Sequence, residues 1–84
     1  MSNPERQRVE RIAKLVAKPS VSSFAPGWDQ SNRGVVEECA DMLDAAGFRV
    51  ERMPLPHAPH KENLIATFGR GEGGLVIAGH SDTV

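Results

Sequence analysis

The chain has 84 residues, of which 39% are hydrophobic and 25% charged, a composition typical of a globular domain. A chain of this length buries only about 60 to 65% of the surface that it exposes when unfolded, so we expect a thin core. The formal net charge of -1, with one Trp and no Tyr, offers little to a phosphate backbone or to stacked bases, and we therefore expect no nucleic-acid partner.

A first helix is predicted for residues 4–17. A polar residue at position 2 or 3 can cap it, and Pro19 ends it because the residue before a proline is pushed out of helical geometry. Residues 19–30 are rich in Ser and predict an irregular loop, in which Trp28 is expected to serve as a buried anchor, with a role against a substrate as the alternative. The apolar residues of the helix fall on one stripe: Val9, Ile12, Ala13 and Val16.

A second helix, capped by Ser31, is predicted to end at Gly47, since a glycine after the last apolar position is the usual left-handed helix terminus. Its apolar face consists of Val36, Cys39, Ala40, Leu43 and Ala46. Residues 48–55 follow directly and predict a half-buried strand. Three prolines, at positions 54, 56 and 59, predict irregular structure until a second strand over residues 63–68.

A third strand is predicted for residues 75–79, which follow a glycine-rich loop. Their sequence, LVIAG, has no polar alternation and is typical of a strand covered on both faces of a layered sheet. The six-residue connection is too short for a helical crossover, so we expect residues 63–68 and 75–79 to form an antiparallel hairpin. The predicted fold class is α/β, in the order α-α-β-β-β with this hairpin last.

Three motifs suggest chemistry that the surrounding sequence does not support. Residues 69–74 match the spacing of a dinucleotide fingerprint, but they lead into a strand and not into a helix that could hold a pyrophosphate. His57 and His60 lie in a proline-rich segment that no cluster of Cys or carboxylate residues flanks to complete a metal site, so a solvated loop is favoured. Ser81 stands between a His and an Asp, yet neighbouring side chains of an extended segment point to opposite faces, which disfavours a serine-hydrolase triad.

The same alternation favours a metal site at His80 and Asp82. Residues i and i+2 of an extended segment share a face, so the imidazole and the carboxylate should lie side by side. A neutral imidazole binds divalent ions such as zinc, and a carboxylate beside it can fix the orientation of the ring. The alternative is a plain hydrogen bond that closes a turn at the end of the strand.

The context of this pair resembles the M20 family of metallopeptidases and deacylases. The resemblance rests on NLIATFG at residues 63–69, the glycine loop, LVIAGHSDTV at residues 75–84, PSVS at residues 19–22 and DQSN at residues 29–32. It implies the amino-terminal part of a layered α/β/α catalytic domain, with His80 as a ligand of one metal ion and Asp82 as the catalytic-site carboxylate that orients it. The family more often has Thr at position 81, and Ser81 keeps the hydroxyl.

The resemblance also implies an activity: hydrolysis of the amide of a small N-acyl amino acid with one or two zinc or cobalt ions. The 84 residues are then expected to be an incomplete catalytic domain, inactive alone, without the lid domain through which such enzymes commonly dimerise. A single cysteine, Cys39, and a charged start predict a cytoplasmic protein, and the longest apolar run is far below the ~20 residues of a membrane span. Alternatives left open are a desuccinylase of the succinyl-diaminopimelate type, a carboxypeptidase, and a non-catalytic remnant or interaction module.

Overall fold

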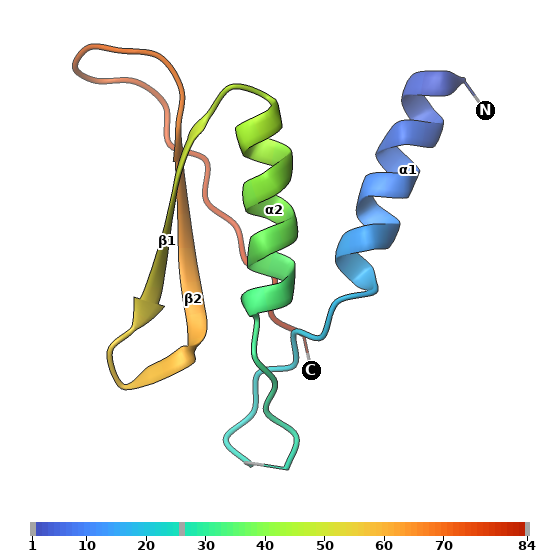
Figure 1. The fold of residues 1–84 in the computed structure, drawn as a ribbon, viewed down its shortest axis with the longest axis vertical. Coiled ribbons are helices and arrows are strands. Elements are labelled where there is room, and N and C mark those ends of the chain that lie inside the picture. The colour runs from blue at the N-terminus through green and yellow to red at the C-terminus, as the bar shows by residue number, and fades with distance from the viewer. Residues whose placement is uncertain (1, 26, 84) are drawn as a thin grey trace.

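The computed structural model describes residues 2–25 and 27–83; Val84, the last residue of the predicted family motif, lies outside them. Four elements follow one another: α1 (Asn3–Val16), α2 (Arg33–Ala45), β1 (Arg49–Leu55) and β2 (Ala58–Thr67). The expected α/β class and the order of helices before strands are confirmed (Figure 1).

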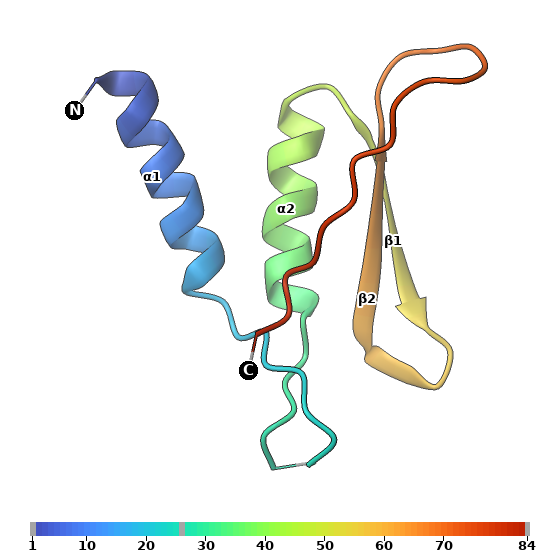
Figure 2. The ribbon, with the colours of Figure 1, turned by 180° about the vertical axis from the view of Figure 1, so that it is seen from behind.

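Helix α1 begins as its sequence predicts. Ser2 is its N-cap, and the Ser2 hydroxyl accepts a hydrogen bond from the backbone N–H of Glu5 at 3.3 Å. The apolar stripe is not buried, however: Val9, Ile12 and Val16 are 52%, 59% and 78% exposed. Both views show α2 between α1 and the strands, so α1 does not reach the sheet (Figures 1 and 2). Neither described helix has the length and apolar character that crossing a membrane requires.

Helix α2 supplies the core and packs on both strands. Val35, Val36 and Ala40 are its buried residues, each only 4–6% exposed. The observed N-cap is Asn32, one residue after the predicted one, and the Ser31 hydroxyl accepts from the N–H of Arg33 at 3.1 Å. The helix ends as predicted, with Gly47 at a φ of 93°, in the left-handed region where a glycine carries no Cβ penalty.

The two strands form one antiparallel sheet, with Arg49 opposite Thr67 and Met53 opposite Asn63. The first strand agrees with its prediction, whereas β2 begins at Ala58, five residues earlier than predicted. Proline does not prevent pairing here because each strand of a two-stranded sheet has an open edge, where a missing N–H is tolerated. A register irregularity next to Pro54 accommodates the end of the hairpin.

The third predicted strand is not observed in the part of the chain that the structure describes. Residues 75–79 have no assigned strand pairing, and Leu75, Val76 and Ile77 are 86–88% exposed. The expected final hairpin is replaced by the pairing of β1 with β2. An apolar run becomes a central strand only where neighbouring strands and a covering layer meet it, and the described residues place only α2 against the sheet. Figure 2 shows this segment crossing in front of α2 and the hairpin.

Trp28 is also exposed, at 74%, so the expected buried anchor is wrong. The loop around it is held by polar contacts instead. The backbone N–H groups of Trp28 and Asp29 donate to the carbonyl of Ala25 at 3.0 and 3.2 Å, and the N–H of Gln30 donates to the carbonyl of Val21 at 2.8 Å. These bonds close the loop without an apolar core.

Candidate metal site

The segment that carries the candidate site is docked on residues 20–22. Val21 and Thr83 form an isolated parallel bridge. The N–H of Ser22 donates to the carbonyl of Thr83 at 3.0 Å, and the N–H of Thr83 donates to the carbonyl of Ser20 at 2.9 Å. The hydroxyl of Ser20, a residue only 6% exposed, donates to the carbonyl of Ser81 at 2.8 Å. The backbone is therefore held on both sides of Asp82.

His80 and Asp82 lie side by side, which confirms the geometry predicted from their spacing. His80 Nδ1 is 2.7 Å from Asp82 Oδ1, and their side chains are 81% and 59% exposed. In the tautomer in which Nδ1–H donates to the carboxylate, Nε2 carries the lone pair on the far side of the ring. An ion would therefore bind at Nε2.

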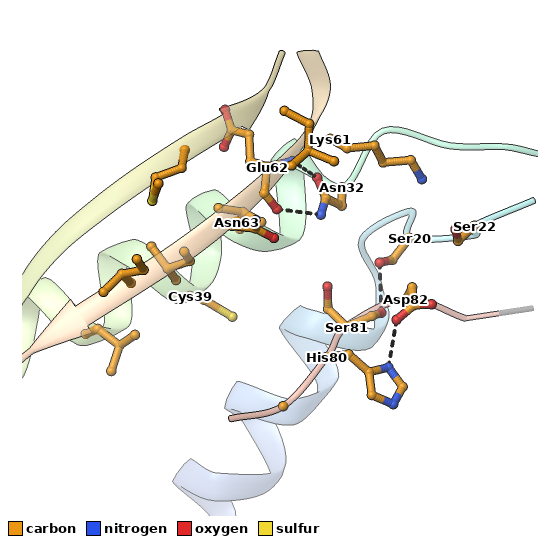
Figure 3. Close-up of a pocket in the computed structure, with 17 residues that line it drawn as sticks. Ser20, Ser22, Asn32, Cys39, Lys61, Glu62, Asn63, His80, Ser81 and Asp82 are labelled. Atoms are coloured by element: carbon orange, nitrogen blue, oxygen red, sulfur yellow. Dashed lines mark hydrogen bonds and ion pairs between the residues drawn. The ribbon is translucent and has the colours of Figure 1, made fainter. Parts of the chain in front are cut away.

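The pair stands at one side of an open pocket with a volume of about 870 Å³. Helix α2 contributes Val36, Cys39 and Leu43 to its lining, and β2 contributes residues 61–65. Figure 3 shows the ring of His80 and the carboxylate of Asp82 facing one another, with Asn32 and Glu62 across the pocket from them. The pocket could admit a small molecule next to the pair.

The donor chemistry fits one corner of a metal site. One neutral imidazole oriented by a carboxylate is a usual ligand arrangement, but a catalytic zinc ion normally takes three protein ligands. Within residues 2–25 and 27–83, no group of three or more His, Cys, Asp or Glu side chains could hold an ion. These residues can supply one ligand and its orienting group, and the remaining ligands would have to come from elsewhere.

The other candidate groups do not add a reactive side chain. Ser81 uses its backbone carbonyl as an acceptor, as part of the docking to Ser20. Burial raises the pKa of the Cys39 thiol, and the negative charge of Glu38 raises it further. The raised pKa disfavours the reactive thiolate. Residues 71, 73 and 74 of the glycine loop have φ values of 103°, 76° and 128°, and the loop leads into irregular chain, so a phosphate-binding helix start is absent from this described segment.

His60, predicted to lie in a solvated loop, is instead part of β2 and contacts Asp29. His60 Nε2 is 3.0 Å from Asp29 Oδ2, while Lys61 Nζ and the N–H of Ser23 lie 3.0 and 3.1 Å from Asp29 Oδ1. The pKa of Asp29 is lowered to about 2, mainly by the hydrogen bond from the Ser23 N–H and then by the hydrogen bonds with His60 and Lys61. No local sequence pattern reveals this cluster, because His60 and Lys61 lie about thirty residues from Asp29. His57 stays in the turn between the strands.

Asn32 and Glu62 form a second contact that the sequence did not reveal. The Asn32 amide donates to the Glu62 carbonyl at 2.9 Å and accepts from the Glu62 N–H at 2.7 Å, as a neighbouring strand would. The Glu62 carboxylate is almost fully buried and lies 2.8 Å from Arg52 Nε and 3.4 Å from Arg33 Nε. The hydrogen bond that Arg52 donates to the Glu62 carboxylate raises the pKa of Arg52. This contact fixes the start of α2 to β2.

No family model matches the chain, but its sequence is similar to named proteins. It is 49% identical over 76 residues to the acetylornithine deacetylase of Pasteurella multocida and 43% identical over 76 residues to that of Photorhabdus laumondii, in each case 90% of this chain. It is also 49% identical over 70 residues, 83% of the chain, to the acetylornithine deacetylase of Vibrio cholerae.

The chain spans about a fifth of the length of these curated relatives, 18 to 20% in each case. The aligned residues nevertheless cover nearly all of the present sequence, at identities of 43 to 49%. The predicted resemblance agrees with these comparisons: over nine-tenths of its length the chain is similar in sequence to proteins named acetylornithine deacetylase.

Proposed function

We propose that this chain is part of the catalytic domain of a metal-dependent amide hydrolase. The complete protein would cleave the acetamide of N2-acetyl-L-ornithine to ornithine and acetate, a step of arginine biosynthesis. Similarity over 76 residues to proteins named acetylornithine deacetylase carries the proposal, and the His80–Asp82 pair at 2.7 Å gives it a chemical location.

In this proposal His80 binds one metal ion through Nε2, and Asp82 holds the ring in the tautomer that leaves Nε2 unprotonated. A bound zinc or cobalt ion would polarise the acetamide carbonyl and make a water molecule more acidic. The pocket beside the pair would receive the small N-acyl amino acid. Docking of Thr83 and Ser81 on residues 20–22 keeps the two side chains together before any ion binds.

The rest of the active site would come from the part of such a protein that these 84 residues do not span. That part would supply the further ligands, the general base and a lid domain through which the complete enzyme dimerises. One imidazole and one carboxylate cannot hold an ion tightly and also take a proton from water. The 84 residues alone should therefore neither hydrolyse acetylornithine nor bind zinc tightly in calorimetry, and a cytoplasmic location agrees with the lone Cys39.

The decisive experiment compares the complete protein with its His80→Ala variant on acetylornithine and on succinyl-diaminopimelate. We expect acetylornithine to be preferred and the variant to lose more than about 100-fold in kcat/KM. The matched control, His57→Ala, changes an exposed histidine in the β turn and should retain activity. Preference for the succinyl substrate would overturn the substrate assignment, and full activity of His80→Ala would overturn the site.

A further inference from the structure

The residues 29–32 share one property: each connects the loop before α2 to another part of the chain. Asp29 contacts His60 and Lys61 on β2, and the hydroxyl of Ser31 donates to the carbonyl of His60 at 2.7 Å. Gln30 pairs with Val21 through both its side chain and its backbone, at 2.9 and 2.8 Å. The whole segment thus joins β2 to residues 20–22, the irregular segment that follows α1.

Lys61 links this segment directly to residues 20–22. Its ammonium lies 3.0 Å from Asp29 Oδ1 and donates to the carbonyl of Val21 at 3.3 Å. Its side chain is only 16% exposed, which strengthens both contacts relative to those of a solvated lysine. Val21 is in turn the bridge partner of Thr83. A continuous set of contacts therefore runs from β2 through Lys61 and Val21 to the residue after Asp82.

The candidate metal-site segment has few other attachments. Residues 75–80 are exposed, and within residues 2–25 and 27–83 the hydrogen bonds that hold residues 81 and 83 involve Ser20 or Ser22. The position of His80 and Asp82 relative to the pocket thus depends on where residues 20–22 lie. Those residues in turn are fixed by Gln30 and Lys61.

We propose that Asp29 and Lys61 are positioning residues: they clamp residues 20–22 to β2 and thereby hold the His80–Asp82 pair at the side of the pocket. They do not touch the reacting atoms. The clamp concerns the geometry of the pair, and its catalytic consequence rests on the function proposed above.

Hydrogen–deuterium exchange of the complete protein tests the clamp independently of activity. In Lys61→Met, which keeps the apolar stem and removes the ammonium, we expect about threefold to tenfold faster exchange at Ser22 and Thr83. Exchange within α2 should not change. Lys61→Arg, which keeps a cationic donor, should restore slow exchange, and Lys14→Met on exposed α1 is the matched control.

Unchanged exchange at Thr83 in Lys61→Met would overturn the clamp, as would equally faster exchange throughout α2, because the residue would then support only general stability. For the complete enzyme, Lys61→Met should lower kcat several-fold, with rescue by Lys61→Arg. Hydrogen exchange at Thr83 could become faster in Lys61→Met while neither the wild type nor any variant hydrolyses acetylornithine. That result would support the clamp and refute the proposed substrate.

Discussion

Two regions of this chain are built in different ways. In the first, α2 lies on the β1–β2 hairpin, with Val36 6% exposed and the rings of Phe48 and Phe68 5.2 Å apart and tilted by 46°. In the second, residues 69–83, the apolar residues are exposed, and in the described structure the backbone of this segment is hydrogen-bonded to Ser20 and Ser22. The first region is stabilised by apolar packing, and the second is held in place by a few hydrogen bonds.

This difference separates the scaffold from the candidate site. Burial of apolar area stabilises α2 and the hairpin, but it does not fix the direction of any polar group. Hydrogen bonds are directional, and those to Ser81 and Thr83 fix the backbone that carries the site pair. Substitutions in the first region should therefore change global stability, whereas those in the second should change local geometry.

The largest contrast is expected from one substitution made in each region. Val36→Asp places an unpaired charge in the core and should destabilise the chain by about 3 kcal/mol or more. Val76→Asp, at a residue 88% exposed, is the matched control and should stay within about 0.5 kcal/mol of wild type. Urea unfolding followed by circular dichroism measures both, and equal destabilisation would show that residues 75–79 pack in solution.

Asn32→Ala should have the next largest effect. It removes both hydrogen bonds to the Glu62 backbone and leaves a buried N–H and carbonyl without these partners, at a cost of about 1–3 kcal/mol. Asn63→Ala, at an exposed neighbour on β2, serves as the control. Thermal unfolding checks the ranking; if the two variants have the same midpoint, the side-chain pairing contributes nothing to stability.

A smaller loss is expected from Gly47→Ala. An added Cβ would meet only Phe68 Cε2, at an ordinary 3.7 Å, so the cost comes from the left-handed φ of 93° and should be about 1–2 kcal/mol. Gly27→Ala, with open space around the added Cβ, is the control. A neutral Gly47→Ala in chemical denaturation would mean that the turn from α2 to β1 can adopt another conformation.

The smallest effect on stability is expected from Asp29→Asn, and this effect depends on pH. Its pKa is lowered from 3.8 to about 2 by the Ser23 N–H, His60 and Lys61, so its stabilisation is fully present above about pH 4 and is lost as the pH falls toward 2. The gap in unfolding midpoint between wild type and Asp29→Asn should therefore narrow between pH 4 and pH 2. Asp44→Asn on α2 provides the comparison, and a gap independent of pH would contradict the contacts of Asp29.

Local patterns predicted the local structure well. Capping by Ser2 and termination at Gly47 were correct because both depend on groups within one turn of the helix. The proximity of His80 and Asp82 was correct for the same reason, since it follows from the alternation of an extended segment. Their role as ligand and orienting group stays a prediction.

Patterns whose outcome depends on a distant packing surface or a neighbouring strand did not predict the structure. The stripe on α1 and the run at residues 75–79 predicted burial, but burial requires a second surface, and in the described structure none covers them. The prolines at 54 and 59 predicted irregular chain because the sequence does not reveal that the strands lie at open edges.

The sequence by itself determined the helices, one strand, the spacing of the candidate pair and the relationship to the acetylornithine deacetylases, all of which are encoded in neighbouring residues or in long matching segments. Only the tertiary structure brought Asp29 to His60 and Lys61, and Ser20 to Ser81. Those contacts join residues about thirty to sixty positions apart, and their positions depend on how α2 and the hairpin pack, which no local pattern records.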